Sequence, residues 1–287
     1  MTDSHKRENS NIEKIRMQDI KIGGDWSERE IIQAVQGKLK SDASWIGGSS
    51  FCHKIIKRLC REDELIENTG HDCLPPDYYS DTLDIMFDVM RVNDSEGRKH
   101  DNPVFREMSM IKKETAKKIE ELGLSDVSVV IPFLEADESV DYDKIHKFSY
   151  YRKHVSRVVS EHIRKIPIWC KEHPKIKYKG LMILDEAGIY FKGKVLPEVK
   201  EDGSIYWYYI AQKSPIVHYP WLDEFLMAPI FNSNLDFVIW FHPYTEESIL
   251  NTKFLNPKYP ALIVIDVRHK LNGMKLYEES DEWTSSS

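Results

Sequence analysis

Asp84, Asp88 and Glu107 are the residues whose types and spacing are best suited to chemistry. The alternation of apolar and acidic residues predicts a strand over 83–92 and a return strand over 104–111, which places Asp88 opposite Glu107. Neighbouring carboxylates are the hard oxygen ligands that Mg²⁺ prefers, and bound Mg²⁺ activates water and stabilises charge on a phosphodiester. The three acids therefore indicate a magnesium site, with Asp84 as its third ligand.

This chemistry also needs a cation that faces the phosphate. Lys112 and Lys113 begin a helix predicted over 112–122, directly after the return strand, and either of them can supply the amine. The alternative is that the acids lie on the solvated face of an antiparallel pair of strands, because such pairs commonly keep one face in water. In that case they are surface residues without a catalytic role.

The predicted order of elements over residues 28–135 resembles the core of the PD-(D/E)XK nuclease superfamily: a helix, a strand with Asp, a strand with Glu, a helix and a strand. In that family a lysine follows the second acid by two positions. Here Glu107 is followed at that distance by Ser109, so Lys112 or Lys113 would substitute for the lysine.

A Pro-Asp pair does occur, but Pro76-Asp77 lies well before the strand that carries Asp88. The resemblance implies a Mg²⁺-dependent endonuclease that hydrolyses phosphodiester bonds, with Asp88 and Glu107 as metal ligands. We therefore expect a protein that processes DNA or RNA and uses Mg²⁺ as its cofactor.

Positive charge is concentrated in one segment. Residues 144–179 contain eleven Lys or Arg and two acids, a net charge of +9 in a chain whose total is −7. Basic side chains with interleaved aromatics suit a phosphate backbone and unstacked bases. The residues predicted to bind nucleic acid are Arg152, Lys153, Arg157, Arg164 and Lys165. The alternative is a non-catalytic protein whose basic helix docks on an acidic partner protein or on the chain's own acidic C-terminal half.

Cysteine and histidine gather between residues 52 and 73. Four of them could form a structural zinc site, since zinc takes four such ligands tetrahedrally; they are Cys52, Cys60, His71 and Cys73. Their spacing is not the paired spacing of common zinc modules, and a cysteine on the inner side of a helix behaves as a small apolar residue. The pattern favours core cysteines over a zinc site.

The remaining patterns predict a mixed α/β or α+β fold, with a mixed sheet flanked by helices, a helical N-terminus and a β-rich C-terminal half. Helices are expected over 28–39, 51–67, 142–166 (ended by Pro167) and 221–227, hairpin strands over 179–195 and 205–212, and buried strands over 235–241 and 261–267. His242 and Asp266 end buried strands and are second-rank site candidates, whereas Asp185 is expected in a solvated turn.

The expected organisation is a lead-in over 1–26, a core over 27–167, a β-rich half over 168–280 and a frayed tail over 281–287. The alternative is one continuous sheet without a boundary near residues 167–179. The 287 residues contain no phosphate-binding loop, no dinucleotide fingerprint and no apolar run long enough to span a membrane. The polar N-terminus and the four cysteines favour the cytoplasm, with no membrane partner.

Overall fold

The computed structural model describes residues 26–40, 45–46, 49–61, 64–68, 76–94, 147–192, 194–199, 205–210, 216–243, 258–278 and 283–285. All of them belong to the larger of two compact units, Trp26–Glu96 with Tyr142–Ser287. The other unit, Met1–Asp25 with Gly97–Asp141, lies outside the described residues. The strand predicted over 104–111 and the helix predicted over 112–122 fall in that second unit.

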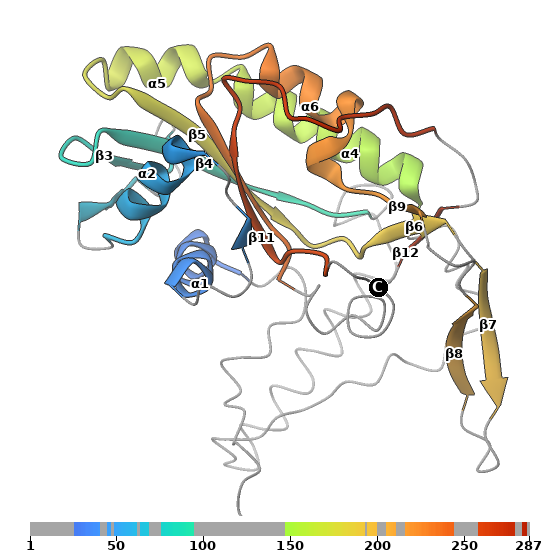
Figure 1. Ribbon diagram of the computed structural model, residues 1–287. Helices are drawn as coiled ribbons and strands as arrows, with labels where there is room; N and C mark the ends of the chain where they lie inside the picture. Colours follow the sequence, from blue (N-terminus) through green and yellow to red (C-terminus); the bar gives the residue numbers. More distant parts are fainter. Residues whose placement is uncertain are drawn as a thin grey trace, which may run out of the picture. The chain divides into compact units, whose positions relative to one another are not determined.

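A seven-stranded mixed sheet forms the centre of the described unit (Figure 1). Its order is β1 (Trp45–Ile46), β11 (Leu262–Asp266), β10 (Phe237–Phe241), β5 (Tyr178–Asp185), β4 (Ile85–Val92), β3 (Tyr78–Ser80) and β2 (Ile66–Glu67). The central pairs β4–β5 and β5–β10 are parallel, while β3 runs antiparallel to β4. The predicted mixed α/β class is confirmed.

Helices cover both faces of this sheet (Figure 1). One face is covered by α1 (Glu28–Lys40) and α2 (Ser50–Leu59), and the other by α4 (Phe148–Ile163), α5 (Ile166–Glu172) and α6 (Glu224–Phe231). Alternation in β4 divides the core accordingly: Phe87 and Val89 pack with α1 and α2, and Met86 and Met90 pack with α4. Strand β4 therefore lies between two helical layers.

Smaller elements complete the described unit. A short 3-10 helix, η4 (Pro220–Leu222), precedes α6. A three-stranded sheet joins β12 (Trp283–Ser285), β6 (Tyr190–Lys192) and β9 (Ile216–Val217), and a hairpin joins β7 (Lys194–Val199) to β8 (Ile205–Ile210).

Two predicted elements need correction. The stretch that begins at Lys179 was expected in a hairpin but forms β5, a central parallel strand whose residues from Gly180 to Asp185 are all buried. Strands covered on both faces read as continuous apolar runs, which is the pattern here. The helix predicted to end at Pro167 stops at Ile163, and Pro167 instead lies in the first turn of α5, where a missing N–H is tolerated.

The sheet is continuous across the position where a boundary was considered. β4 precedes residues 167–179 and β5 begins at their end, yet the two strands pair over eight residues. The centre of the sheet is closely packed at Gly180, which pairs with Phe237 of β10. A Cβ at this position would lie 2.2 Å from two ring carbons of Phe237. In the described ranges no helix is both long and apolar enough to cross a bilayer.

Candidate functional site

Asp77 and Asp88 lie opposite each other where β3 begins. The registered pair Tyr78↔Phe87 continues by one residue to Asp77 and Asp88. The backbone N–H of Asp77 donates to Asp88 Oδ1 at 3.1 Å, and Asp77 Oδ2 accepts from the N–H of Val89 at 2.7 Å. Asp77 precedes the first residue of β3, and its side chain continues the hydrogen-bond ladder beyond that strand. These two hydrogen bonds hold the carboxyl groups of Asp77 and Asp88 side by side.

Glu28, the first residue of α1, is the third acid near this pair. Its Oε2 atom is buried and has no hydrogen-bond partner among the described residues. Burial raises the pKa of Glu28, and the charges of Asp88 and Glu67 raise it further. Burial, then the charge of Asp88, raises the pKa of Asp77 from 3.8 to about 8, despite the hydrogen bond from Val89. The charge of Asp88 therefore disfavours the ionised forms of Glu28 and Asp77, a condition that a bound cation relieves.

An imidazole and an ammonium group reach Asp88 from the end of α4. His162 Nδ1 lies 2.5 Å and Lys165 Nζ 3.8 Å from Asp88 Oδ2. The Asp88 side chain is only 1% exposed, while those of His162 and Lys165 are 17% and 42% exposed. The interpretation of Asp88 as a solvated surface acid is therefore wrong. Asp88 is a buried carboxylate whose two side-chain partners reach the surface.

Asp84 does not join this group. It ends the turn between β3 and β4 with a left-handed φ of 57°, which Asp tolerates better than most residues. Its Oδ1 accepts from the N–H of Lys177 at 2.6 Å, and its carbonyl accepts from the N–H of Tyr178 at 3.3 Å. Asp84 and Asp88 are four positions apart along extended chain, a distance of about 13 Å. Asp84 therefore fixes the entry to β5, and the prediction of Asp84 as the third ligand is corrected: Glu28 is the acid that lies near.

Glu107, Lys112 and Lys113 lie outside the described residues, so their assignment stays a prediction. The sequence interpretation missed Asp77 because it looked for a partner of Asp88 only after β4. The available signal was Pro76-Asp77 immediately before a short aromatic strand.

Of the predicted nucleic-acid-binding residues, Lys153, Arg157 and Arg164 are exposed on or just after α4. Arg157 Nη1 also pairs with Glu161 at 2.9 Å one turn along the helix. Lys165 lies beside Asp88, as described above. These residues keep charged groups at the surface, within reach of a ligand.

Arg152 is different and must be corrected. Its side chain is 4% exposed, and it holds Asp223 through two hydrogen bonds of 3.0 and 3.2 Å. His218 Nε2 lies 3.0 Å from the same carboxylate. Arg152 and Tyr151 lie on the buried face of α4. The Arg152 side chain therefore stabilises the contact between α4 and α6 and is not accessible to a nucleic acid.

The considered zinc ligands are not brought together in the described residues. Cys52 is buried in α2, where its Sγ lies 3.4 Å from the carbonyl of Val264, and Cys60 follows the same helix. His71 and Cys73 lie outside the described ranges. Within those ranges, no three His, Cys, Asp or Glu side chains are grouped as ligands of one metal ion.

The donor set at the acidic site nevertheless suits Mg²⁺. Glu28, Asp77 and Asp88 offer carboxylate oxygens, the ligands that this cation takes. The Oε2 atom of Glu28 is buried and has no hydrogen-bond partner among the described residues. Burial and the charge of Asp88 raise the pKa of Asp77 to about 8. A divalent cation would require the carboxylates to approach one another more closely, with Asp77 deprotonated.

Asp185 and the two second-rank candidates, His242 and Asp266, have internal partners. Asp185 ends β5 fully buried and accepts hydrogen bonds from the Tyr151 hydroxyl at 2.5 Å and from Trp240 Nε1 at 2.8 Å, so it is not the solvated turn acid expected. Burial raises the pKa of Asp185 to about 7. Burial lowers the pKa of His242 to about 3, and Asp266 pairs with Arg268. These contacts are accounted for by folding alone.

No family model, curated protein or solved structure matches the chain. The geometry of the site is therefore the basis for any functional assignment.

Proposed function

We propose that the protein is a Mg²⁺-dependent nuclease that hydrolyses phosphodiester bonds at an acidic site formed by Glu28, Asp77 and Asp88. The observation that carries the proposal is the side-by-side placement of Asp77 and Asp88 on paired strands, with a third acid and a lysine amine close by.

The order of elements supports this proposal. Helix α1 is followed by Asp77 at the start of β3, Asp88 in β4, helix α4 and then β5 parallel to β4. This order resembles the PD-(D/E)XK core. The two acids of the pattern are here Asp77 and Asp88, each one strand earlier in the chain than Asp88 and Glu107, which the sequence pattern indicated. Pro76-Asp77 then occupies the position of the family's Pro-Asp pair, and Lys165 takes the place of its lysine.

Each residue has a role that follows from its position. Asp77 and Asp88 would hold the cation together with Glu28, and Mg²⁺ when bound supplies water activation and charge neutralisation. His162 orients Asp88 through the 2.5 Å contact. Lys165 lies 3.8 Å from Asp88 and keeps a partly exposed side chain, so its amine can face a phosphate oxygen.

The test is a cleavage assay with plasmid, linear DNA and RNA in Mg²⁺ or Mn²⁺, with a chelator as blank. We expect cleavage by the wild type, and its loss in Asp77→Asn and in Asp88→Asn. Asp84→Asn is the matched control, because Asn also tolerates a left-handed φ, and it should cleave normally. Cleavage that persists in both Asp77→Asn and Asp88→Asn contradicts the proposal.

DNA or RNA as the ligand of α4 is part of the same proposal. Lys153, Arg157 and Arg164 present exposed charge there, whereas Arg152 is neutralised by Asp223 of the C-terminal half. Among the described residues, the Arg152–Asp223 pair favours the alternative, in which the basic helix meets acidic protein surface. Nucleic-acid binding that falls steeply with salt supports the nuclease, and no binding at low salt supports an acidic protein partner.

A further inference from the structure

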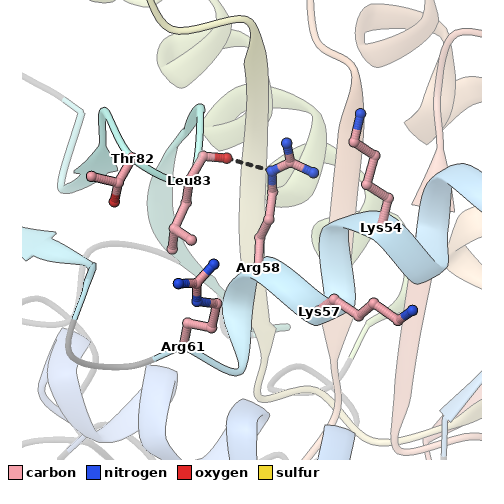
Figure 2. A pocket seen from close by; sticks show the side chains of 6 residues that line it. All are labelled: Lys54, Lys57, Arg58, Arg61, Thr82 and Leu83. Carbon is pink, nitrogen blue, oxygen red and sulfur yellow. Dashed lines mark hydrogen bonds between the residues drawn. The ribbon is translucent and has the colours of Figure 1, made fainter.

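A cavity of about 290 Å³ lies between α2 and the turn that joins β3 to β4. Figure 2 shows that its charged wall comes from α2 and from Arg61, two residues beyond the helix, with the turn on the other side. The lining residues are Lys54, Lys57, Arg58, Arg61, Thr82 and Leu83. Because α2 and α4 cover opposite faces of the sheet, this cavity is separate from the contacts that His162 and Lys165 make with Asp88.

Cations crowd around one ring beside this cavity. Lys54 Nζ, the Arg58 guanidinium and Lys177 Nζ lie 4.8, 4.9 and 5.3 Å from the ring centroid of Tyr178. The Lys54 amine also donates to the Tyr178 hydroxyl at 2.7 Å. Three like charges around one ring repel each other, and an anion placed among them removes that repulsion.

Arg58 is fixed in a position to receive such an anion. Its Nε donates to the carbonyl of Leu83, which anchors the guanidinium and leaves its two terminal nitrogens on the far side from that carbonyl (Figure 2). An anchored guanidinium loses little entropy when it binds an oxyanion, and its paired N–H groups match two oxygens of a phosphate.

Negative charge in the described residues offsets only part of this cluster. Glu64 pairs with Arg61 and accepts from the Thr82 hydroxyl at 2.8 Å. The Lys57 side chain is exposed, and within the described ranges its amine makes no hydrogen bond or ion pair. The wall of the cavity therefore carries more positive charge than its described neighbours neutralise.

We propose that this cavity binds a phosphate group, with Arg58 as the bidentate donor and with Lys54, Lys57 and Arg61 around it. Its volume lies near the lower end of the range for small-ligand pockets, about 300–1,000 Å³, which suits pyrophosphate or the phosphorylated end of a nucleic-acid strand. The site is independent of the acidic site, so it stands whether or not the protein is a nuclease.

The experiment is isothermal titration calorimetry at low salt with a chelator present, using Asp77→Asn as the background so that no cleavage occurs. The probes are pyrophosphate, a short oligonucleotide with a 5′-phosphate and the same oligonucleotide with a 5′-hydroxyl. Lys57→Gln and Arg61→Gln are tested against Lys171→Gln, which removes one exposed charge from α5 on the other face. Each cavity variant should weaken binding about tenfold, because each loses a charged hydrogen bond, and the α5 control should not.

The outcomes separate the two sources of phosphate. Binding of pyrophosphate alone identifies a free phosphate anion, and preference for the 5′-phosphate over the 5′-hydroxyl identifies a strand end; either result supports the site. Absence of binding by all probes overturns it, as does unchanged affinity in both Lys57→Gln and Arg61→Gln. Thermal melting shows that the variants remain folded.

A second readout is specific to the cavity. The hydrogen bond from Lys54 lowers the pKa of the Tyr178 hydroxyl, and the charges of Lys177 and Arg58 act in the same direction. A phosphate bound among these cations disfavours the phenolate, so pyrophosphate should raise the pKa of Tyr178. Ultraviolet titration of the protein against Tyr178→Phe measures that change, and an unchanged Tyr178 pKa at saturating pyrophosphate places the ligand elsewhere.

Discussion

Asp77→Asn is expected to be more stable than the wild type at pH 8 and to show little advantage at pH 4. Burial and the charge of Asp88 raise the folded-state pKa of Asp77 to about 8, against an ordinary value of 3.8. Below 3.8 the carboxyl is protonated in both states and carries no penalty. As the pH rises towards 8, the unfolded chain ionises while the folded site holds its proton, so wild-type stability falls across this window.

The side-chain amide of Asn cannot ionise, and it can still accept the hydrogen bond from Val89. One pKa unit corresponds to about 1.4 kcal/mol. Because solvent screens the half-buried Asp77, we expect the advantage to grow by about 2 kcal/mol between pH 4 and pH 8, less than the full shift implies.

Urea unfolding at several pH values measures this difference. Asp84→Asn serves as the control, since Asp84 lies in the turn away from Asp88 and its advantage should not grow with pH. A constant difference between Asp77→Asn and the wild type from pH 4 to pH 8 would mean that Asp77 is not held next to another ionised acid.

Arg152→Ala should destabilise the protein by about 3–5 kcal/mol, because it leaves a buried carboxylate without its cation. Asp223 is fully buried, and Arg152 donates two hydrogen bonds to it. Burial alone would raise the pKa of Asp223, but hydrogen bonds from His218 and Arg152 keep this pKa below its ordinary value. Without Arg152, its two hydrogen bonds no longer offset the unfavourable free energy of burying the Asp223 carboxylate.

Lys153→Ala is the neighbouring control on the same helix; its side chain is exposed, and its effect should stay within about 0.5 kcal/mol. The double variant Arg152→Ala with Asp223→Ala should lose less than the sum of the single losses, since the second change removes the unpaired charge. Chemical denaturation gives all four values. Equal small losses in Arg152→Ala and Lys153→Ala would contradict the buried pair and restore Arg152 as a surface residue.

Much of the fold could be predicted because local patterns were strong. The helix predicted over 28–39 is α1, and apolar runs predicted β10 and β11 within two residues. The helix over 51–67 was predicted too long, since α2 ends at Leu59 and its later apolar residue Ile66 belongs to β2. Periodicity does not mark a helix end that lacks Gly or Pro.

The acidic site could be predicted only in part. Period-two alternation correctly set Asp88 apart from the Phe87 face of β4, but it could not reveal that α4 buries this second face. Asp77 and Glu28 come near Asp88 through strand register and helix packing, which depend on contacts far apart in the sequence. The segment 144–179 was correctly identified as basic. The position of Arg152 on the predicted helix did not, however, show that its side chain is buried.

The most direct test of the central claim is the effect of Mg²⁺ on thermal stability in the wild type, in Asp77→Asn with Asp88→Asn, and in Asp84→Asn. A ligand that binds only the folded state stabilises it, by roughly 2.7 kcal/mol at a hundredfold excess over Kd. If Glu28, Asp77 and Asp88 hold the cation, Mg²⁺ raises the melting temperature of the wild type and of Asp84→Asn but not of the double variant. An equal Mg²⁺ response in all three proteins, or none in the wild type, contradicts a metal site at these acids.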